Sequence, residues 1–164
     1  MLEIRPAETA DHAKILHLWH RGWHDAHADL VPPEVLAFRT ESHFAIWLKE
    51  ARDTFYVAID AQLVGFVYVK DAEVVKLYVG KSARGTGVAH ALLSFAEELL
   101  FEKGVQEAEL FCTAGNSRAE KFYKREGWNL SASFDDALWV PEGSGGGFLV
   151  PTHRFQKALM PVAR

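Results

Sequence analysis

The sequence has one cysteine, no long apolar run and no excess of positive charge, and each absence excludes a class of protein. The single cysteine, Cys112, allows no disulfide within the chain and no metal site built from cysteines. No segment approaches the roughly 18 uninterrupted apolar residues of a membrane-spanning helix. The formal net charge of −4 argues against a general nucleic-acid binder. The first residues lack the basic stretch and apolar run of a secretion signal, so we expect a cytoplasmic protein.

The length and composition indicate one globular domain over residues 1–164. A chain of this length can bury a substantial core. Hydrophobic residues make up 49% and charged residues 24% of the sequence, which is ordinary for a globular protein. The sequence contains no internal repeat and no segment with the composition of an interdomain linker.

The hydrophobic pattern predicts strands first and then a strand–helix–strand unit. The predicted strands are Leu2–Arg5, Thr54–Ile59, Gln62–Lys70, Glu73–Val79, Glu107–Thr113, Asn129–Ser133 and Phe148–Lys157. The predicted helices run from Thr9 or Asp11 to about Ala26, over Glu34–Ala51 with a break near Thr40–Ser42, from Val88 to about Gly104, and from a capping box at Ser117–Glu120 to Gly127. The strands on either side of the third helix should lie parallel.

A glycine-rich turn joins the fourth predicted strand to the third predicted helix. The turn contains Arg84-x-x-Gly87-x-Ala89. The first N–H groups of a helix have no partners within it, so they can bind an anion, and glycines let the backbone approach a phosphate closely. Arg84, together with Lys81, adds cationic donors. A plain strand-to-helix turn is the alternative; the segment lacks the Gly-Lys-Ser/Thr of a Walker A loop and the third glycine of a dinucleotide fingerprint.

A second motif follows at Asn116-Ser-Arg-Ala119-Glu-Lys-Phe122-Tyr123-Lys-Arg-Glu-Gly127-Trp128. Together with the glycine-rich turn, its residue types and order resemble the two coenzyme A motifs of the Gcn5-related N-acetyltransferase (GNAT) family. The resemblance is close from Glu73 to Trp128, and the ending Pro151–Leu159 is similar to the family's last strand. The N-terminal third matches only in general pattern.

The resemblance implies a mixed α/β fold and acetyl-coenzyme A as the acyl donor, with no metal. The family has a mixed, mostly antiparallel sheet of six or seven strands, flanked by about four helices. Its fourth and fifth strands, here Glu73–Val79 and Glu107–Thr113, splay apart in a V that holds the donor. The implied donor-binding residues are Leu77, Tyr78, Val79, Arg84, Gly85, Thr86, Gly87, Val88, Ala89, Asn116 and Phe122.

Each of these groups has an implied contact. The backbone around Leu77–Val79 would pair with the pantetheine arm, as an added strand pairs with a sheet edge. The N–H groups of Arg84–Ala89 would hold the pyrophosphate. Asn116 would hydrogen-bond the pantetheine, and Phe122 would pack beside it.

Two residues are candidates for the acid–base chemistry. Tyr123 matches the family's general-acid position, and a tyrosine with a pKa near ~10 is protonated at neutral pH; the alternative is a tyrosine buried for packing. Glu73 is the candidate base, because its placement on the fourth strand resembles that of the glutamate base of histone acetyltransferases. Its spacing of two from Val75 and Leu77 predicts that all three share one face. A solvated turn acid is the alternative. Tyr78, on the opposite face, is expected to be core or wall.

The acceptor site has the weakest signals. His17, His20, His24 and His27 recur at steps of three and four on the first helix, nearly opposite its apolar face. A solvated polar face is the simplest interpretation, and a metal site is an alternative. Because the family's first helices border the acceptor pocket, Trp23, His24 and His27 are substrate-binding candidates, whereas Trp19 and Cys112 are expected in the core.

The segment Asp135–Gly147 is acidic and glycine-rich and is predicted to be a surface loop. Asp135, Asp136 and Glu142 could favour a cationic amine acceptor, although a solvated loop is the alternative.

The leading functional hypothesis is transfer of an acetyl group from acetyl-coenzyme A to a primary amine of a small molecule, by direct attack on the thioester. A peptide or protein acceptor, at an N-terminal amine or a lysine, is the second hypothesis. A non-catalytic acyl-coenzyme A sensor is the third, and Tyr123 argues against it. A homodimer is compatible with the resemblance, and no nucleic-acid or membrane partner is expected.

Overall fold

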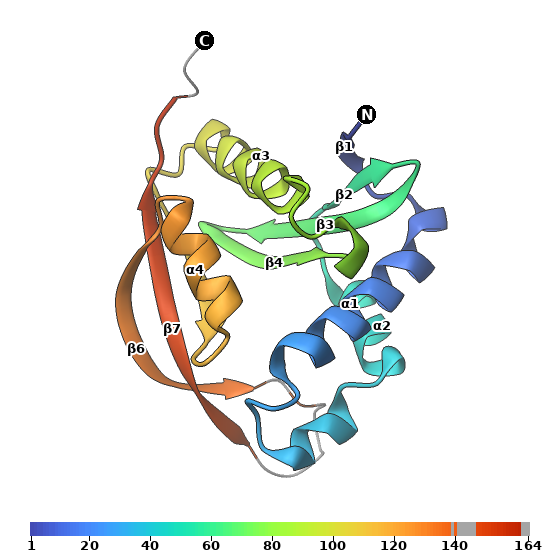
Figure 1. The fold of residues 1–164 in the computed structure, drawn as a ribbon, viewed down its shortest axis with the longest axis vertical. Helices are drawn as coiled ribbons and strands as arrows, with labels where there is room; N and C mark the ends of the chain where they lie inside the picture. Colours follow the sequence, from blue (N-terminus) through green and yellow to red (C-terminus); the bar gives the residue numbers. More distant parts are fainter. Residues whose placement is uncertain (139, 141–146, 162–164) are drawn as a thin grey trace.

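Figure 1 shows a computed structural model of the chain, which describes residues 1–138, 140 and 147–161. The strands of the described residues form one seven-stranded sheet in the order β1-β2-β3-β4-β5-β7-β6. Only β4 and β5 are parallel neighbours; the other pairs are antiparallel. The predicted mixed sheet is therefore confirmed.

The elements follow the predicted order along the chain. The strands are β1 (Glu3–Pro6), β2 (Phe55–Asp60), β3 (Gln62–Lys70), β4 (Glu73–Val79), β5 (Glu107–Thr113), β6 (Asn129–Leu138) and β7 (Phe148–Ala158). The α-helices are α1 (His12–His27), α2 (Glu41–Glu50), α3 (Val88–Glu102) and α4 (Ser117–Arg125). Short 3-10 helices occupy Thr9–Asp11, Pro33–Phe38 and Lys81–Ala83. No helix in these described ranges is both long and apolar enough to cross a membrane.

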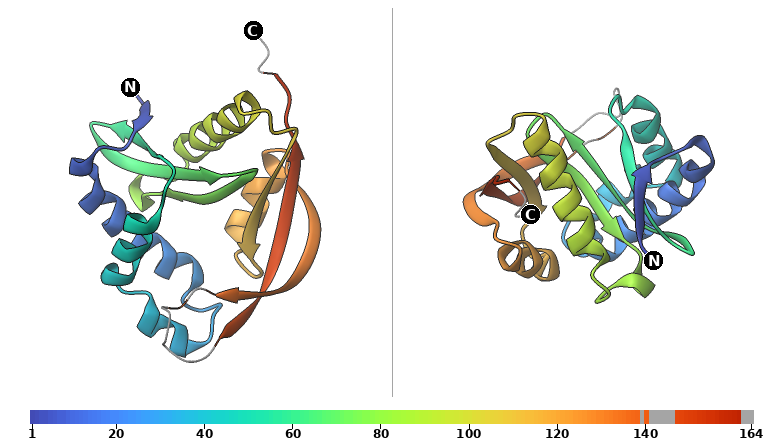
Figure 2. Two further views of the ribbon diagram at one scale, coloured as in Figure 1. Left: turned by 180° about the vertical axis from the view of Figure 1, so that it is seen from behind. Right: turned by 90° about the horizontal axis from the view of Figure 1, so that it is seen from above.

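The helices cover the two faces of the sheet in pairs, as Figure 2 shows from above. One apolar cluster joins α3 and α4 to the sheet through residues such as Leu92, Tyr123 and Phe155. The other joins α1 and α2 to β2–β4 around Trp19 and Phe44. Burial of these two apolar clusters fixes the helices against the strands that line the candidate site. Trp19 is 2% exposed, so its predicted place in the core is confirmed.

The parallel strands β4 and β5 separate almost as soon as they meet (Figure 1). They share a single register pair, Glu73 with Glu109, and the Glu109 N–H donates to the Ala72 carbonyl oxygen over 2.9 Å. Beyond this point each strand pairs only with its other neighbour, β3 for β4 and β7 for β5. The predicted V between the fourth and fifth strands is confirmed.

A β-bulge in β4 changes which side chains face the same way. Tyr68 pairs with Lys76 but Val69 pairs with Val74, so Val75 is an extra residue on β4. Val74 packs in the cluster under α3, as Leu77 does, whereas Val75 packs in the cluster under α1 and α2. The expectation that Val75 and Leu77 share a face is therefore wrong. Because side chains alternate between the two faces of a strand, Glu73 lies on the same face as Val75, which is the face toward α1 and α2.

The start of α4 also differs from the prediction. Asn116, not Ser117, is the N-cap residue, and its side-chain oxygen accepts a hydrogen bond from the Ala119 N–H over 3.4 Å. The Ser117 hydroxyl instead donates to the Gly115 carbonyl oxygen. Asparagine is as favourable a cap as serine, and the motif places it one residue earlier.

The last hairpin is longer than predicted. β6 continues to Leu138, and Asp135 and Asp136 pair with Pro151 and Val150 of β7. The expectation of a loop from Asp135 is wrong, because pairing with the long β7 overrides the low strand propensity of two aspartates. Glu142 lies outside the described residues.

Candidate functional site

A pocket of about 940 Å³ lies where β4 and β5 separate. Residues of β4 from Glu73 to Val79 form one wall, and Phe111 to Thr113 of β5 form the facing wall. Side chains from α1, α4 and the glycine-rich turn complete the lining. The pocket runs along β4, because both Val79, which leads into the turn, and Glu73, at the opposite end of the strand, line it. Trp23 of α1 and Trp47 of α2 also line it.

The glycine-rich turn has the conformation that an anion site needs. Gly85 and Gly87 have φ angles of +76° and +89°, which favour glycine. A Cβ atom on either would meet no other atom within 4 Å, so the space above the turn is open. Gly87 is the N-cap of α3, and the N–H groups of the next residues, including Ala89, begin the helix without partners inside it.

The other residues of the turn have separate roles. The Thr86 hydroxyl donates to the Ala83 carbonyl oxygen and fixes the turn. The Val88 side chain is buried in the core, and neither Thr86 nor Val88 is among the residues that line the pocket. The Arg84 guanidinium lies 3.9 Å from the Asp25 carboxylate of α1. Partial burial, and then the nearby Arg118, lower the pKa of Arg84.

The cationic side chains that line this end of the pocket come from the turn and from α4. They are Arg84, Arg118, Lys121 and Arg125. A phosphate-bearing ligand would meet these side chains together with the backbone N–H groups of the turn, which is the arrangement that phosphate binding requires.

The middle of β4 presents an unpaired edge to the pocket. Leu77, Tyr78 and Val79 line it, and the only ladder pair with β5 lies at the far end, at Glu73. Backbone N–H and C=O groups at such an edge can pair with an extended ligand. Across the pocket, Asn116 and Phe122 of the α4 segment also line the wall.

Tyr123 lies at the wall of the pocket within an aromatic group of α4 and β7. Its ring centroid is 5.3 Å from that of Phe122 and 6.0 Å from that of Phe155. Burial, and then the neighbouring Cys112 thiol and Tyr78 phenol, raise the pKa of Tyr123. The phenol is therefore protonated throughout the neutral range and can donate a proton or a hydrogen bond.

Cys112 lies in the core, as expected, and its residue also borders the pocket. Burial raises the pKa of its thiol to about 12. A thiol is a nucleophile only as the thiolate, so this cysteine is unreactive at neutral pH.

Glu73 stands at the point where the V closes. Burial, and then the neighbouring Glu109 carboxylate, raise the pKa of Glu73. Glu109 itself is bound by Arg154 of β7, whose guanidinium nitrogen lies 2.8 Å from a Glu109 carboxylate oxygen. A carboxylate with a raised pKa in a pocket is suited to proton transfer.

Two of the three substrate-binding candidates line the pocket, Trp23 and His27. The His27 Nδ1–H donates to the Trp23 carbonyl oxygen over 3.0 Å, and the two rings stack at 5.2 Å. Burial lowers the pKa of His27 to about 4, so it is neutral. His24 is not among the lining residues; its Nε2–H donates to the Arg39 carbonyl oxygen over 2.7 Å.

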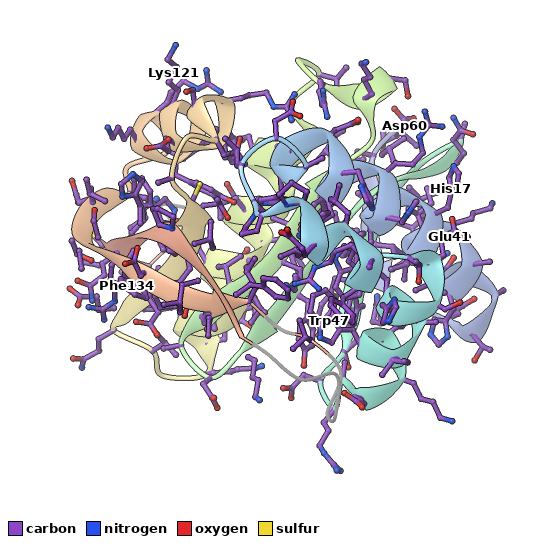
Figure 3. All side chains as sticks on the ribbon, turned by 90° about the horizontal axis from the view of Figure 1, so that it is seen from below. His17, Glu41, Trp47, Asp60, Lys121 and Phe134 are labelled. Atoms are coloured by element: carbon purple, nitrogen blue, oxygen red, sulfur yellow. The ribbon has the colours of Figure 1, made fainter. Side chains whose placement is uncertain are left out.

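The histidine stripe is not a solvated face. Only His17 is exposed, beside Glu41 of α2 at 3.5 Å (Figure 3). His20 and His24 are half-buried with ring centroids 4.6 Å apart, because α2 packs over this side of α1. The described residues contain no group of three or more histidine, cysteine or acidic side chains that could hold a metal ion.

Sequence reasoning missed several residues that line the pocket. These are Arg39, Trp47, Lys76, Phe111 and Phe134. Asp136, which the sequence placed among the acids that could favour a cationic amine, also lines the pocket. Trp47 lies between α2 and the strands, and Phe134 stands on β6 (Figure 3). Only Lys76 had a signal in the sequence, because a lysine within an apolar strand that is covered on both faces must be accommodated by a specific site.

Comparisons with known proteins agree with this arrangement. A model of the acetyltransferase (GNAT) family matches residues 13–128. No curated protein matches the chain. A GCN5-related N-acetyltransferase from Rhodopseudomonas palustris is similar in structure, with a TM-score of 0.74, 20% sequence identity, and coverage of 96% of this chain and 95% of that one.

Two further solved structures are similar over nearly their full lengths. The ribosomal-protein-alanine N-acetyltransferase from Brucella melitensis has a TM-score of 0.71 and 22% identity, covering 96% of this chain and 99% of that one. The PaiA N-acetyltransferase from Thermoplasma acidophilum, in complex with coenzyme A, has a TM-score of 0.68 and 19% identity, with the same coverages. At these identities the likeness establishes the fold.

Proposed function

The chain belongs to the acetyltransferase (GNAT) family, and we propose that it transfers the acetyl group of acetyl-coenzyme A to the primary amine of a small molecule. In this proposal residues 1–164 form one catalytic domain. The observation that carries it is the pocket between β4 and β5, which has an open glycine turn at one end and a half-buried tyrosine with a raised pKa at its wall.

The described residues fit the donor. The open space above Gly85 and Gly87 and the first N–H groups of α3 would hold the pyrophosphate. The unpaired edge of β4 at Leu77–Val79 would bind the pantetheine arm, with Asn116 and Phe122 opposite. The PaiA neighbour, solved with coenzyme A, supports this choice. When bound, acetyl-coenzyme A supplies an activated acetyl group.

Glu73 would prepare the acceptor for attack. A free alkyl amine with a pKa near ~10 is mostly protonated at pH 7 and cannot attack a thioester. The Glu73 carboxylate, directly or through water, would take a proton from the amine nitrogen, whose lone pair then forms the new C–N bond. The raised pKa of Glu73 makes this carboxylate a better proton acceptor than an ordinary glutamate.

Tyr123 would assist the leaving group. As the C–S bond breaks, its electron pair goes to the sulfur, and the Tyr123 hydroxyl would donate its proton there. A backbone N–H of β4 near Tyr78 would stabilise the negative charge that develops on the thioester oxygen. The products are the N-acetylated amine and free coenzyme A thiol.

An assay of thiol release tests the proposal and separates it from the other two hypotheses. The purified protein is incubated with acetyl-coenzyme A and either a panel of small amines or a panel of peptides. Turnover with small amines supports the proposal, and turnover with peptides alone establishes a peptide acceptor. Coenzyme A binding measured by calorimetry, with no turnover on either panel, would identify a sensor domain.

A further inference from the structure

Three side chains that the proposed acetyl transfer does not use are linked across β6, β7 and α4. The Ser133 hydroxyl oxygen lies 2.7 Å from Nδ1 of His153, and Nε2 of the same imidazole lies 3.3 Å from a carboxylate oxygen of Glu120. Ser133 and His153 stand opposite each other in the β6–β7 ladder, where facing side chains are close enough to bond. Glu120 comes from α4, which packs against β6. A hydroxyl, an imidazole and a carboxylate are thus joined in that order.

The two contacts of the imidazole give proton transfer one direction. In a neutral imidazole one nitrogen donates a hydrogen bond and the other accepts one. An ionised Glu120 carboxylate only accepts, so Nε2 carries the hydrogen and Nδ1 accepts from the Ser133 hydroxyl. Nδ1 is therefore in position to take the hydroxyl proton when the oxygen attacks a carbonyl carbon, while Glu120 fixes the tautomer. The roles are those of a Ser-His-acid triad, with the two ring nitrogens exchanged.

Burial distinguishes this arrangement from an ordinary pair of polar surface residues. The side chains of His153 and Glu120 are only 22% and 20% exposed, so the base and the carboxylate that orients it are held by their surroundings. Ser133 is exposed, so a substrate can reach its hydroxyl. Ser131 is also exposed on β6, but its hydroxyl donates to the Arg154 carbonyl oxygen over 3.1 Å. The two serines therefore differ in that Ser133 has the imidazole as its partner.

Ser133 and His153 line a second pocket, of about 280 Å³, on the β6–β7 hairpin. Phe134, which Figure 3 labels, and Pro151 contribute apolar surface to it. Its volume is below the range of about 300–1,000 Å³ that is usual for pockets of drug-sized ligands. The pocket therefore suits a short acyl group rather than a long one.

The edge of the sheet supplies a hydrogen-bond donor near the same hydroxyl. Among the described strands, β6 is the last of the sheet, so alternate N–H groups along it have no ladder partner. Because the alternation has a period of two, one of these groups belongs to Ser133 or to the next residue. A backbone N–H in that position can stabilise the negative oxygen that forms when a hydroxyl attacks a carbonyl group.

We propose that Ser133 is the nucleophile of a second site, which hydrolyses esters of short carboxylic acids. The Ser133 oxygen forms a bond to the ester carbonyl carbon as its proton passes to Nδ1 of His153. The bond from that carbon to the alcohol oxygen then breaks, its electron pair stays on the alcohol oxygen, and His153 returns the proton there. Water, deprotonated by the same nitrogen, hydrolyses the acyl group from Ser133. The inference goes beyond the proposed function, since the reaction uses neither coenzyme A nor Tyr123.

A covalent probe for reactive serines tests the site. The full chain is treated with a fluorophosphonate in the absence of coenzyme A, and the labelled residue is identified by peptide mass spectrometry. We expect the label on Ser133 and not on Ser131. His153→Ala should lower the rate of labelling at Ser133 by about 100-fold, within the range for general base catalysis.

Hydrolysis of para-nitrophenyl acetate measures turnover at the same site. Ser133→Ala should reduce the rate to that of the His153→Ala protein, whereas Ser131→Ala, the matched control on the same strand, should keep the full rate. Circular dichroism establishes that each variant is folded.

Glu120 is a positioning residue, because it acts through His153. Glu120→Gln keeps the size of the side chain and removes its charge. We expect kcat for ester hydrolysis to fall by about 10-fold or more, because the tautomer is no longer fixed, with KM within about 2-fold because the pocket is unchanged. Glu102→Gln, exposed at the end of α3, is the control and should alter neither constant. A rise in KM with kcat unchanged would contradict the assigned role.

The outcomes decide the inference without reference to acetyl transfer. Labelling of Ser133 that depends on His153, with ester hydrolysis lost in Ser133→Ala, supports it. Absence of label on Ser133, equal labelling of Ser131, or hydrolysis that Ser133→Ala leaves unchanged overturns it. If His153→Ala does not fold, the two serine variants decide, since both residues are exposed. Because no assay here contains coenzyme A, either result leaves the proposed function to its own test.

Discussion

A Cβ atom on Gly22 of α1 would lie 2.6 Å from Cδ1 of Tyr78 on β4. No real side chain tolerates such a contact, so the glycine lets the helix backbone rest directly on the tyrosine ring. The Tyr78 ring also stacks on that of Phe66, with ring centroids 5.6 Å apart. The position of α1, and of the residues it contributes to the pocket, depends on this contact.

Gly22→Ala should therefore destabilise the protein although alanine favours helices. The ring cannot move away without disturbing Phe66, so we expect the free energy of unfolding to fall by about 1–3 kcal/mol, the range for overpacking. Denaturant unfolding measures it. The neighbouring exposed residue provides the control, since Arg21→Ala should change stability little. A Gly22→Ala protein as stable as the Arg21→Ala protein would disprove the close contact.

Gly87→Ala and Gly104→Ala form a matched pair at the two ends of α3. Both glycines have φ near +90° and open space where a Cβ would stand. Each substitution should cost about 1–2 kcal/mol of backbone strain. Only Gly87→Ala should also weaken coenzyme A binding, because it alone adds an atom to the proposed pyrophosphate site. Calorimetric titration with coenzyme A makes the comparison, and equal affinities of the two variants would place the phosphates elsewhere.

Tyr123→Phe removes the proposed proton donor and leaves the aromatic packing intact. We expect kcat to fall by about 100-fold, within the range for general acid catalysis, and coenzyme A affinity to stay within about 2-fold. Tyr56→Phe, on β2 and away from the pocket, is the matched control. Steady-state kinetics with saturating acetyl-coenzyme A measures the effect. Unchanged kcat would remove Tyr123 from the mechanism.

The pH dependence of the reaction reports on Glu73. A protonated carboxyl cannot accept a proton, so activity should fall as the pH is lowered through its pKa. Because burial and Glu109 raise that pKa, the fall should begin at a higher pH than an ordinary glutamate allows. Glu73→Gln should lower kcat/KM and remove this limb of the profile. Glu98→Gln, exposed on α3, should leave the profile unchanged, and a limb that persists in Glu73→Gln must belong to another group.

The end of the pocket at the glycine-rich turn, which is the proposed donor end, could be predicted from the sequence because it is local. The turn around Gly87 and the segment from Asn116 to Tyr123 are each continuous, so the spacing of their residues determines how they lie. Both line the pocket together. The V between β4 and β5 followed from the family resemblance rather than from any residue pattern.

The proposed acceptor end could not be predicted because it is assembled from distant segments. Arg39, Trp47 and Lys76 come together only when α2 packs against the sheet. The bulge at Val75 was also hidden, since an extra residue in a strand is visible only in its pairing with β3. Because of that extra residue, Glu73 and Leu77 lie on opposite faces of β4, although they were expected to share one face.

The single register pair between β4 and β5 gives the sheet a pivot. Among the described residues, Glu73 and Glu109 form the only ladder link between the β1–β4 half and the β5–β7 half. A change in the aperture of the V about this point breaks no other strand pairing. The displacement is smallest at the pivot, where Glu73 stands, and grows with distance along the V. With respect to such a change, Glu73 stands at the point that would move least, whereas Tyr123 of α4 stands farther along the V.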